Sequence, residues 1–416
     1  MTDKRDYAKL WVSTGISALG DGVTLAAGPL LMATITRDPA LIAGAVFAQQ
    51  LPWLLFSLFS GAFVDRVDRR VLVGVVDTTR GLVIAALALL VWYDRVSVPA
   101  VYGAVFLMGV GSTLADNAAQ ALVPSVVGTE DLPKANAWLS GARMLCSQFA
   151  GPPLGGWLFA AGAALPFGVD AATFLLAAVL VFAIRPGAHT GRAATDPGRP
   201  IAERTSVRRD IGEGFRWLWS HRALRVLAVV AGLMNLTFGG AFASYVLFAK
   251  ERLGLTEVGY GFLLSATAVG GVVGTLTVAR LDARFGAAPL LRAGLIVETL
   301  AHLVFAVTRS PWVAAVTLVI FGAHTTIWGV VADTYRQRAT PARLLGRANS
   351  VYLLFSMGGF ALGSLLGGFV AKAFGITAPF WVAFAAMTAL TALVWRVVTP
   401  SVFTSAAPER QQPVSA

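Results

Sequence analysis

The sequence predicts an all-α membrane protein with twelve transmembrane helices in two six-helix bundles. Three observations lead to this prediction: the 416 residues are 56% hydrophobic and only 13% charged, they contain twelve apolar runs, and the two halves of the chain repeat each other. Soluble domains carry roughly a quarter charged residues. A bilayer favours apolar surface and penalises unpaired polar groups, so the composition indicates a membrane protein before any motif is considered.

Twelve apolar runs are long enough to cross a bilayer, whose hydrocarbon core of about 30 Å requires about 20 helical residues. The first six are 10–33, 41–64, 71–92, 98–123, 135–160 and 165–184. The second six are 223–248, 258–278, 290–307, 312–331, 348–374 and 378–398. A long polar stretch separates the two sets, so we expect two groups of six spans.

The Lys and Arg residues are distributed unevenly between the loops of the two expected membrane surfaces. With the N-terminus inside, only six of the 33 basic residues fall in outward loops: Arg37, Arg95, Lys250, Arg252, Arg309 and Lys372. Since cytoplasmic loops carry the excess of Lys and Arg, we expect both termini in the cytoplasm. The net charge of +11 then reflects membrane topology, which argues against nucleic acid as a partner.

The polar stretch between the two sets of spans divides the chain. We expect an N-terminal bundle over 1–184, a cytoplasmic linker over 185–222, a C-terminal bundle over 223–399 and a disordered cytoplasmic tail over 400–416. Within the linker, Ile211, Phe215, Leu218 and Trp219 recur near helical spacing. This pattern predicts a short amphipathic helix on the inner membrane surface.

The two halves repeat at a nearly constant offset. Lys134-Ala135-Asn136 returns as Arg347-Ala348-Asn349 after 213 residues, and Leu154-Gly155-Gly156 returns as Leu366-Gly367-Gly368 after 212. The agreement of these offsets predicts a duplicated six-helix unit. In transporters built from two parallel repeats, the substrate is held between the halves near the midplane.

The turn between spans two and three carries a recognisable motif. Its sequence runs from Gly61 through Asp65, Arg66 and Asp68 to Arg69 and Arg70. It resembles the GxxxDRxGRR signature of the major facilitator superfamily, although Asp68 replaces the second glycine. Physically, glycine permits close helix approach, the aspartate suits a helix N-terminus, and the arginines can bind carboxylates across the seam.

We therefore expect a cytoplasmic latch between the two halves. Its members are Gly61, Asp65, Arg66, Arg69, Arg70, Asp116 and Arg143. The alternative is that these residues form only a cluster of positive charge that sets the membrane topology.

Span five contains Gly151-Pro152-Pro153-Leu154-Gly155-Gly156, which resembles the GPxxGG core of the drug:proton antiporter branch. Proline removes a backbone donor and bends a helix, while glycines give a flat packing surface. Gly151, Pro152, Gly155 and Gly156 are therefore expected to form a hinge or seal. Ordinary glycine packing beside a proline kink is the alternative.

Further stretches resemble the branch that contains macrolide-efflux proteins and the enterobactin exporter. They are 17–21, 115–124, 213–219, 337–341 and 346–349. The resemblance implies a multi-pass protein of the bacterial inner membrane, a monomer without cofactors that exports an amphipathic drug, antibiotic or siderophore-like molecule in exchange for protons. Import or facilitated movement of a metabolite or lipid is one alternative. A non-transporting sensor or scaffold is another.

Ionisable residues inside the spans are the candidates for proton coupling, because their burial is costly without a partner. Asp21 lies about 16 Å along span one and is therefore near mid-bilayer. Desolvation favours its neutral form, so it can take up and release a proton. A local hydrogen bond beside the flanking glycines is the alternative. Asp116 is expected to pair with Arg143 or with the latch arginines, either as a switch or as a static pair.

The second half offers weaker candidates. Glu298 is a possible second proton carrier, and Asn235, His324 and Trp328 are candidates for the substrate cavity. Packing is the alternative for the histidines, since two scattered histidines do not make a metal site. Phosphate-loop, zinc-protease and serine-hydrolase motifs are absent from the sequence, and it has one cysteine, Cys146. We therefore expect neither an enzyme nor a metal or cofactor site.

Overall fold

Long apolar helices make up nearly all of the computed structural model, which describes residues 4–64, 67–185 and 207–399. The first half contains α1 (Lys4–Ile35), α2 (Pro39–Val64), α3 (Arg69–Trp92), α4 (Val98–Val126), η1 (Thr129–Asp131), α5 (Leu132–Met144), η2 (Leu145–Ala150), α6 (Gly151–Ala161) and α7 (Leu165–Phe182). No strand occurs in the described ranges. Because lipid offers backbone groups no hydrogen-bond partners, helices satisfy them within each segment.

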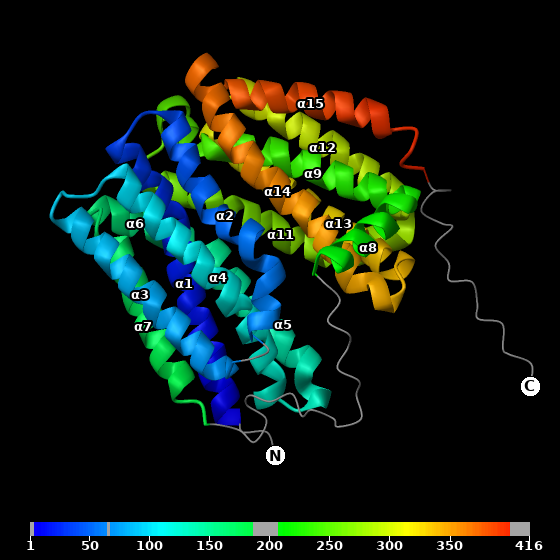
Figure 1. Cartoon of the computed structure of the whole chain (residues 1–416). Helices are drawn as coiled ribbons and strands as arrows, with labels where there is room; N and C mark the ends of the chain where they lie inside the picture. The colour runs from blue at the N-terminus through cyan, green and yellow to red at the C-terminus, as the bar shows by residue number, and fades with distance from the viewer. Residues whose placement is uncertain (1–3, 65–66, 186–206, 400–416) are drawn as a thin grey trace, which may run out of the picture.

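The second half continues in the same way (Figure 1). It contains α8 (Val207–Ser220), α9 (Arg222–Ala243), α10 (Tyr245–Leu247), η3 (Phe248–Arg252), α11 (Glu257–Phe285), α12 (Ala287–Val307), α13 (Pro311–Ala339), α14 (Ala342–Phe374) and α15 (Ala378–Val394). Ten of the described helices are long and apolar enough to cross a membrane. The α8 segment coincides with the predicted amphipathic helix.

Two expected spans fall outside those ten. The last one, α15, is apolar but has 17 helical residues. The fifth is divided into α5, the π-helical segment η2 and α6, which follow one another without a gap. The π-helical segment ends directly before Gly151-Pro152-Pro153, where two prolines lack the amide hydrogens of a regular α-helix. One of the carbonyls freed in this way, that of Phe149, accepts a 2.9 Å hydrogen bond from Ser265 Oγ of α11.

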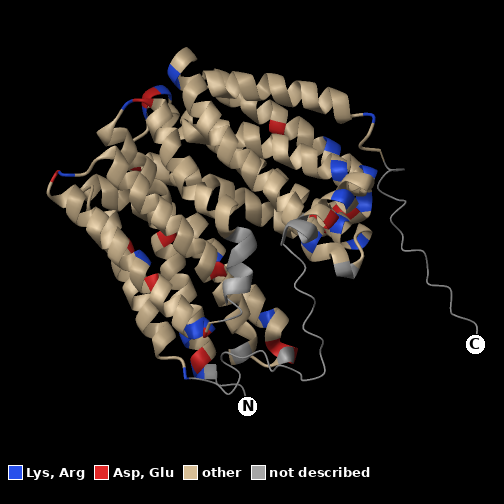
Figure 2. Cartoon of the chain, in the orientation of Figure 1, with Lys and Arg blue, Asp and Glu red and all other residues tan. Residues whose placement is uncertain are grey.

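Charged residues gather at the ends of the helices, and the middle sections contain few (Figure 2). We call the end that holds the start of α1, the α2–α3 turn, α8 and the α11–α12 turn the basic end. The other end, which holds the α1–α2 and α3–α4 loops, is called the opposite end. Asp68 begins α3 at the basic end, where its carboxylate accepts hydrogen bonds from the amides of Arg70 (2.9 Å) and Val71 (3.2 Å). The aspartate that replaces a motif glycine therefore acts as an N-cap.

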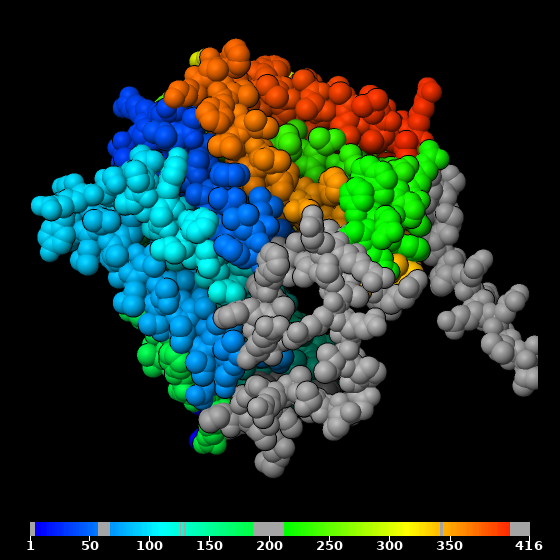
Figure 3. Space-filling view, in the orientation of Figure 1, coloured from blue at the N-terminus to red at the C-terminus, as the bar shows by residue number. Residues whose placement is uncertain are grey.

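The buried apolar core joins the two halves only toward the opposite end of the described structure. The largest cluster there combines Leu30 and Phe167 of the first half with Phe248 and Phe380 of the second. Each of the other three clusters contains residues of one half alone. The surfaces of α2 and α14 meet side by side in Figure 3. The halves are thus packed together at the opposite end.

Glycines of the span-five motif allow this packing. Gly151 and Gly155 lie directly against the backbone of α1, and Gly156 lies against the carbonyl of Glu257 in α11. A Cβ atom at any of these three positions would collide with backbone atoms. Pro152 is buried, and its carbonyl contacts Gly261 of α11. The expected hinge residues therefore form a flat contact on two faces of α6.

The repeated glycines of α14 make the corresponding contacts in the second half. Gly367 lies against Gly240 of α9, as Gly155 lies against α1. Gly368 lies against the start of α2, as Gly156 lies against the start of α11. The sequence repeat is therefore also a repeat of helix contacts.

An ion pair closes the opposite end beside this contact. Lys372 Nζ of α14 donates a 2.6 Å hydrogen bond to Asp38 Oδ2 in the α1–α2 loop. This bond holds the pKa of Asp38 below its ordinary value. The contribution of the pair is therefore present at neutral pH and is lost as the pH falls through the lowered pKa.

Removing this ion pair should loosen the opposite end slightly. Ala43 is buried and contacts Gly368, so a cysteine at this position reacts with maleimide only when the opposite end opens. The measurement uses Ala43→Cys in a Cys146→Ala background. Asp38→Asn is expected to raise the labelling rate by at most about five-fold, because an exposed ion pair is worth about 1 kcal/mol or less. Asp94→Asn is the control. An equal increase in both variants would contradict the assigned role.

Candidate functional site

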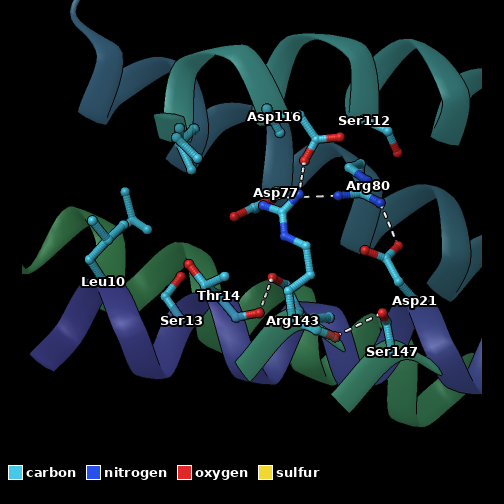
Figure 4. A pocket seen from close by; sticks show the side chains of 16 residues that line it. Leu10, Ser13, Thr14, Asp21, Asp77, Arg80, Ser112, Asp116, Arg143 and Ser147 are labelled. Carbon is cyan, nitrogen blue, oxygen red and sulfur yellow. Dashed lines mark hydrogen bonds and ion pairs between the residues drawn. The ribbon is translucent and has the colours of Figure 1, made fainter. Parts of the chain in front are cut away.

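A polar cavity of about 170 Å³ lies within the first half, among α1, α3, α4, α5 and α7 (Figure 4). It contains a set of five charged residues, which we call the charged cluster: Asp21, Asp77, Arg80, Asp116 and Arg143. A second cavity of about 440 Å³ shares Leu10, Thr14, Ala119 and Arg143 with it. Since Leu10 lies in the first turns of α1, this second cavity extends from the charged cluster toward the basic end.

Arg80 is the buried centre of the charged cluster. Its side chain is 7% exposed, and its Nη2 donates a 2.6 Å hydrogen bond to Asp21 Oδ1 of α1. Nη1 lies 3.9 Å from Oδ1 of Asp77, one helical turn earlier on α3. The guanidinium also lies 4.0 Å above the ring of Phe174 from α7. A buried charge of this kind persists because several groups compensate it.

Asp116 and Arg143 form the second ion pair of the charged cluster. Arg143 Nη1 donates a 2.7 Å hydrogen bond to Asp116 Oδ1, which joins α5 to α4. The two side chains are 45% and 53% exposed, so water in the cavity screens the pair. Asp21 is 44% exposed in the same cavity. The structure thus offers two accessible carboxylates, each of which has an arginine partner.

The expected latch is only partly described. Asp65 and Arg66 lie outside the described residues, and so do the surroundings of Gly61. Arg69 Nη1 donates a 3.0 Å hydrogen bond to the carbonyl of Ala121, and Arg70 bonds the carbonyl of Ile184.

Those two acceptors belong to the first half, whereas the sequence led us to expect carboxylates across the seam. The carbonyls lie near the C-terminal ends of α4 and α7, where unpaired carbonyls and the helix dipole attract cations. Of the seven latch candidates, the structure brings Asp116 and Arg143 into direct contact.

Asp170 of α7 is a further acidic residue close to this site. It is fully buried and accepts a 2.5 Å hydrogen bond from Thr24 Oγ1 of α1. Gly20, which precedes Asp21, packs directly on the carboxylate of Asp170. No motif in the sequence marks Asp170 as part of this site. The glycine beside Asp21 was the available signal that another helix approaches there.

The ionisable residues of the second half form a separate, enclosed group. Glu298 of α12 is 1% exposed, and its Oε2 lies 2.8 Å from His324 Nε2 of α13. His302 Nε2 lies 3.5 Å from Glu298 Oε1. His324 and Trp328 are buried and pack against Gly294 of α12. The contact between Glu298 and His324 was not foreseen, because spacing along one helix does not show which neighbouring helix it faces.

Asn235 links two helices of the second half. Its side-chain amide donates to the carbonyl of Ala231 at 2.9 Å and to Ser356 Oγ of α14 at 3.0 Å. Within the part of the chain that the structure describes, no group of three or more His, Cys, Asp and Glu residues is placed to hold a metal ion.

The comparisons with known proteins agree with this arrangement. A family model described as transmembrane secretion effector matches residues 3–414. The chain belongs to this family of major facilitator transporters. It is 27% identical to the multidrug efflux pump Tap of Mycobacterium tuberculosis, over 88% of this chain and 87% of that protein. It is 24% identical to the enterobactin exporter EntS of Shigella boydii, over 87% and 84%. This family is one of efflux and secretion transporters, not of enzymes.

Solved structures share the fold at low sequence identity. The inward-facing form of a bacterial homologue of the iron transporter ferroportin superposes with a TM-score of 0.76 at 19% identity, covering 96% of this chain and all of that one. Its outward-facing form gives 0.61 at 18% identity, covering 94% and 98%. The helical membrane fold of the major facilitator transporters is thereby confirmed.

The two arginines of the charged cluster should differ in their effect on stability. Arg80→Met leaves buried Asp77 without its counter-charge, so we expect a loss of about 3 kcal/mol in the free energy of unfolding. Arg143→Met removes the partner of a half-exposed carboxylate and should cost about 1 kcal/mol or less. Unfolding in mixed detergent micelles measures both. Equal losses of unfolding free energy in the two variants would show that burial does not determine how much each arginine contributes.

Proposed function

We propose that the chain is a twelve-helix exporter in which two six-helix bundles, 1–184 and 223–399, alternate around a central substrate path. The continuous α5–η2–α6 segment serves as the fifth span and α15 as the twelfth. Residues 185–222 connect the bundles. The matching contacts of Gly155 with α1 and of Gly367 with α9 support this duplicated plan.

The charged cluster is the proposed coupling site, and the half-exposed Asp21 is the observation that carries this proposal. Asp21 lies midway along α1, faces a polar cavity and is bound to Arg80 through one oxygen. Protonation of Asp21 would weaken its hydrogen bond to Arg80. Binding or release of the substrate would in turn change the protonation of Asp21. Because a proton changes the charge balance of a buried network, it can bias the packing of the helices around it.

Export of an amphipathic small molecule is the function that these features support best. Two of the relatives are a multidrug efflux pump and an enterobactin exporter, both of which are exporters of organic molecules. A charged cavity beside apolar helix surfaces suits a molecule with a polar and an apolar part. Antibiotics and siderophore-like compounds belong to this class.

The described conformation corresponds to the state open at the basic end. Its packing contacts between the halves lie at the opposite end, and the helix arrangement is closer to the inward-facing form of the ferroportin homologue than to the outward-facing form. We place the basic end and both termini in the cytoplasm because Lys and Arg gather there. The protein then resides in the bacterial inner membrane and acts as a monomer, with protons and substrate as its partners, no cofactor and no nucleic acid.

The coupling role of Asp21 can be tested by dye efflux. Cells that express the protein should accumulate less ethidium than cells without it, and an uncoupler should abolish the difference. Asp21→Asn, which keeps the size of the side chain but cannot exchange a proton, is expected to lose at least about ten-fold in efflux rate. Efflux by Asp21→Asn that stays at the wild-type rate and remains sensitive to the uncoupler would remove Asp21 from the mechanism.

Three further measurements complete this test. Asp282→Asn changes an exposed carboxylate in the last turn of α11 and should leave efflux unchanged at equal expression. Inverted membrane vesicles show the direction of transport: dye uptake driven by an inside-acidic gradient supports export. Movement in the other sense would favour an importer. Glu298→Gln tests the second proton candidate in the same assay.

A further inference from the structure

The second half contains an apolar cavity that is separate from the charged cluster. It has a volume of about 50 Å³ and lies among α9, α11, α12, α13 and α15. Its largest lining side chains are aromatic: Phe238, Phe242, Tyr245, Phe305, Phe321 and Phe380. The cavity therefore lies inside one bundle, and neither the latch nor the proposed proton site uses it.

Two polar side chains that line this cavity each carry an atom without a hydrogen-bond partner in the described part of the chain: the hydroxyl of Tyr245 and Nδ1 of His302. Tyr245 is 5% exposed and His302 is 2% exposed. Among the described residues, neither the hydroxyl of Tyr245 nor Nδ1 of His302 makes a hydrogen bond, whereas Nε2 of His302 faces Glu298 Oε1 at 3.5 Å. Burying an unpaired polar group costs free energy, so such groups are expected to have a partner. A ligand that carries a hydrogen-bonding atom would supply it.

A second apolar cavity adjoins the first at Phe242. It has a volume of about 60 Å³ and is lined by α1, α2 and α4 of the first half together with the end of α9. Phe242 is the one residue that lines both cavities, and it is less buried than Tyr245 beside it. Its ring thus separates a cavity at the seam between the halves from a cavity inside the second half.

We propose that the two cavities form one apolar subsite, with the ring of Phe242 as a movable partition, for an aromatic group that carries a hydrogen-bonding atom. Each cavity alone is smaller than the engineered cavity of about 150 Å³ that takes up benzene. Rotation of one phenyl ring would join the spaces of about 50 and 60 Å³ into one that is closer to that size. The aromatic walls then contact the ring, and Tyr245 and His302 bond its polar atom.

This inference rests on the proposed export function for its biological role, since the subsite would hold the apolar part of a transported molecule. The charged cluster lies in the other half of the protein. A molecule with a polar and an aromatic part could therefore contact both halves at once. The binding step itself does not require transport, so it can be tested separately.

The test uses p-cresol and p-xylene, two molecules of similar shape. The hydroxyl group of p-cresol stands where p-xylene has a second methyl group. The full chain carries 4-fluorophenylalanine at position 242, and fluorine NMR follows its resonance in detergent micelles. We expect a saturable shift with p-cresol and binding at least three-fold tighter than that of p-xylene. The same label at Phe167, which is fully buried and lines neither cavity, is the matched control and should not show a saturable shift.

Tyr245→Phe tests the hydrogen-bonding part without changing the shape of the cavity. It removes only the unpartnered hydroxyl, so the variant should unfold at the same or a higher temperature than the wild type. Its preference for p-cresol over p-xylene should fall at least two-fold. The proposal is overturned if labels at 242 and 167 respond alike, or if both ligands bind equally and Tyr245→Phe changes nothing. Loss of ethidium efflux in Asp21→Asn is read independently of these results.

Discussion

Close approach of helix backbones at glycine is the constraint on which the rest of the structure depends. Lipid does not drive apolar helices together, so their association relies on van der Waals contact and on hydrogen bonds. Gly155 and Gly156 allow α6 to touch helices of both halves, and Gly367 and Gly368 do the same for α14. Without these four contacts, the apolar cluster that joins the halves at the opposite end could not close.

The charged side chains inside the two halves differ in their exposure, although the halves are related by a sequence repeat. In the first half, Asp21, Asp116 and Arg143 are about half exposed in a polar cavity. In the second half, Glu298 is enclosed by apolar helices and faces His324. The first arrangement can exchange protons with water in the cavity. The second is shielded from this water, which is why the proposed coupling site is in the first half.

Much of the fold could be predicted from the sequence because the bilayer restricts the possible structures. Apolar runs of sufficient length must be helices, and the repeat of 212 to 213 residues predicted a duplicated six-helix unit. The pair of Asp116 with Arg143 was one of the predicted alternatives, since both lie at similar depth. The latch arginines were harder to place, because Arg69 and Arg70 can reach either carboxylates or helix-end carbonyls.

Contacts that depend on helix rotation could not be predicted. Glu298 reaches His324 because of how α12 faces α13, and the sequence of one helix does not contain this information. Likewise, the prolines at 152 and 153 indicated a kink but not that the freed carbonyl of Phe149 would bind Ser265. Asp68 also departs from the family motif, and only the structure shows that it caps α3.

The matching glycine contacts between the two halves also define an axis. One lies where α6 meets the start of α11, and the other lies where α14 meets the start of α2. Two small points of contact at one end of a molecule define a line. A rigid rotation of one half about that line preserves both contacts while it separates or joins everything at the other end. The smooth glycine surfaces at these two points permit such a rotation, and side chains that interlocked there would resist it.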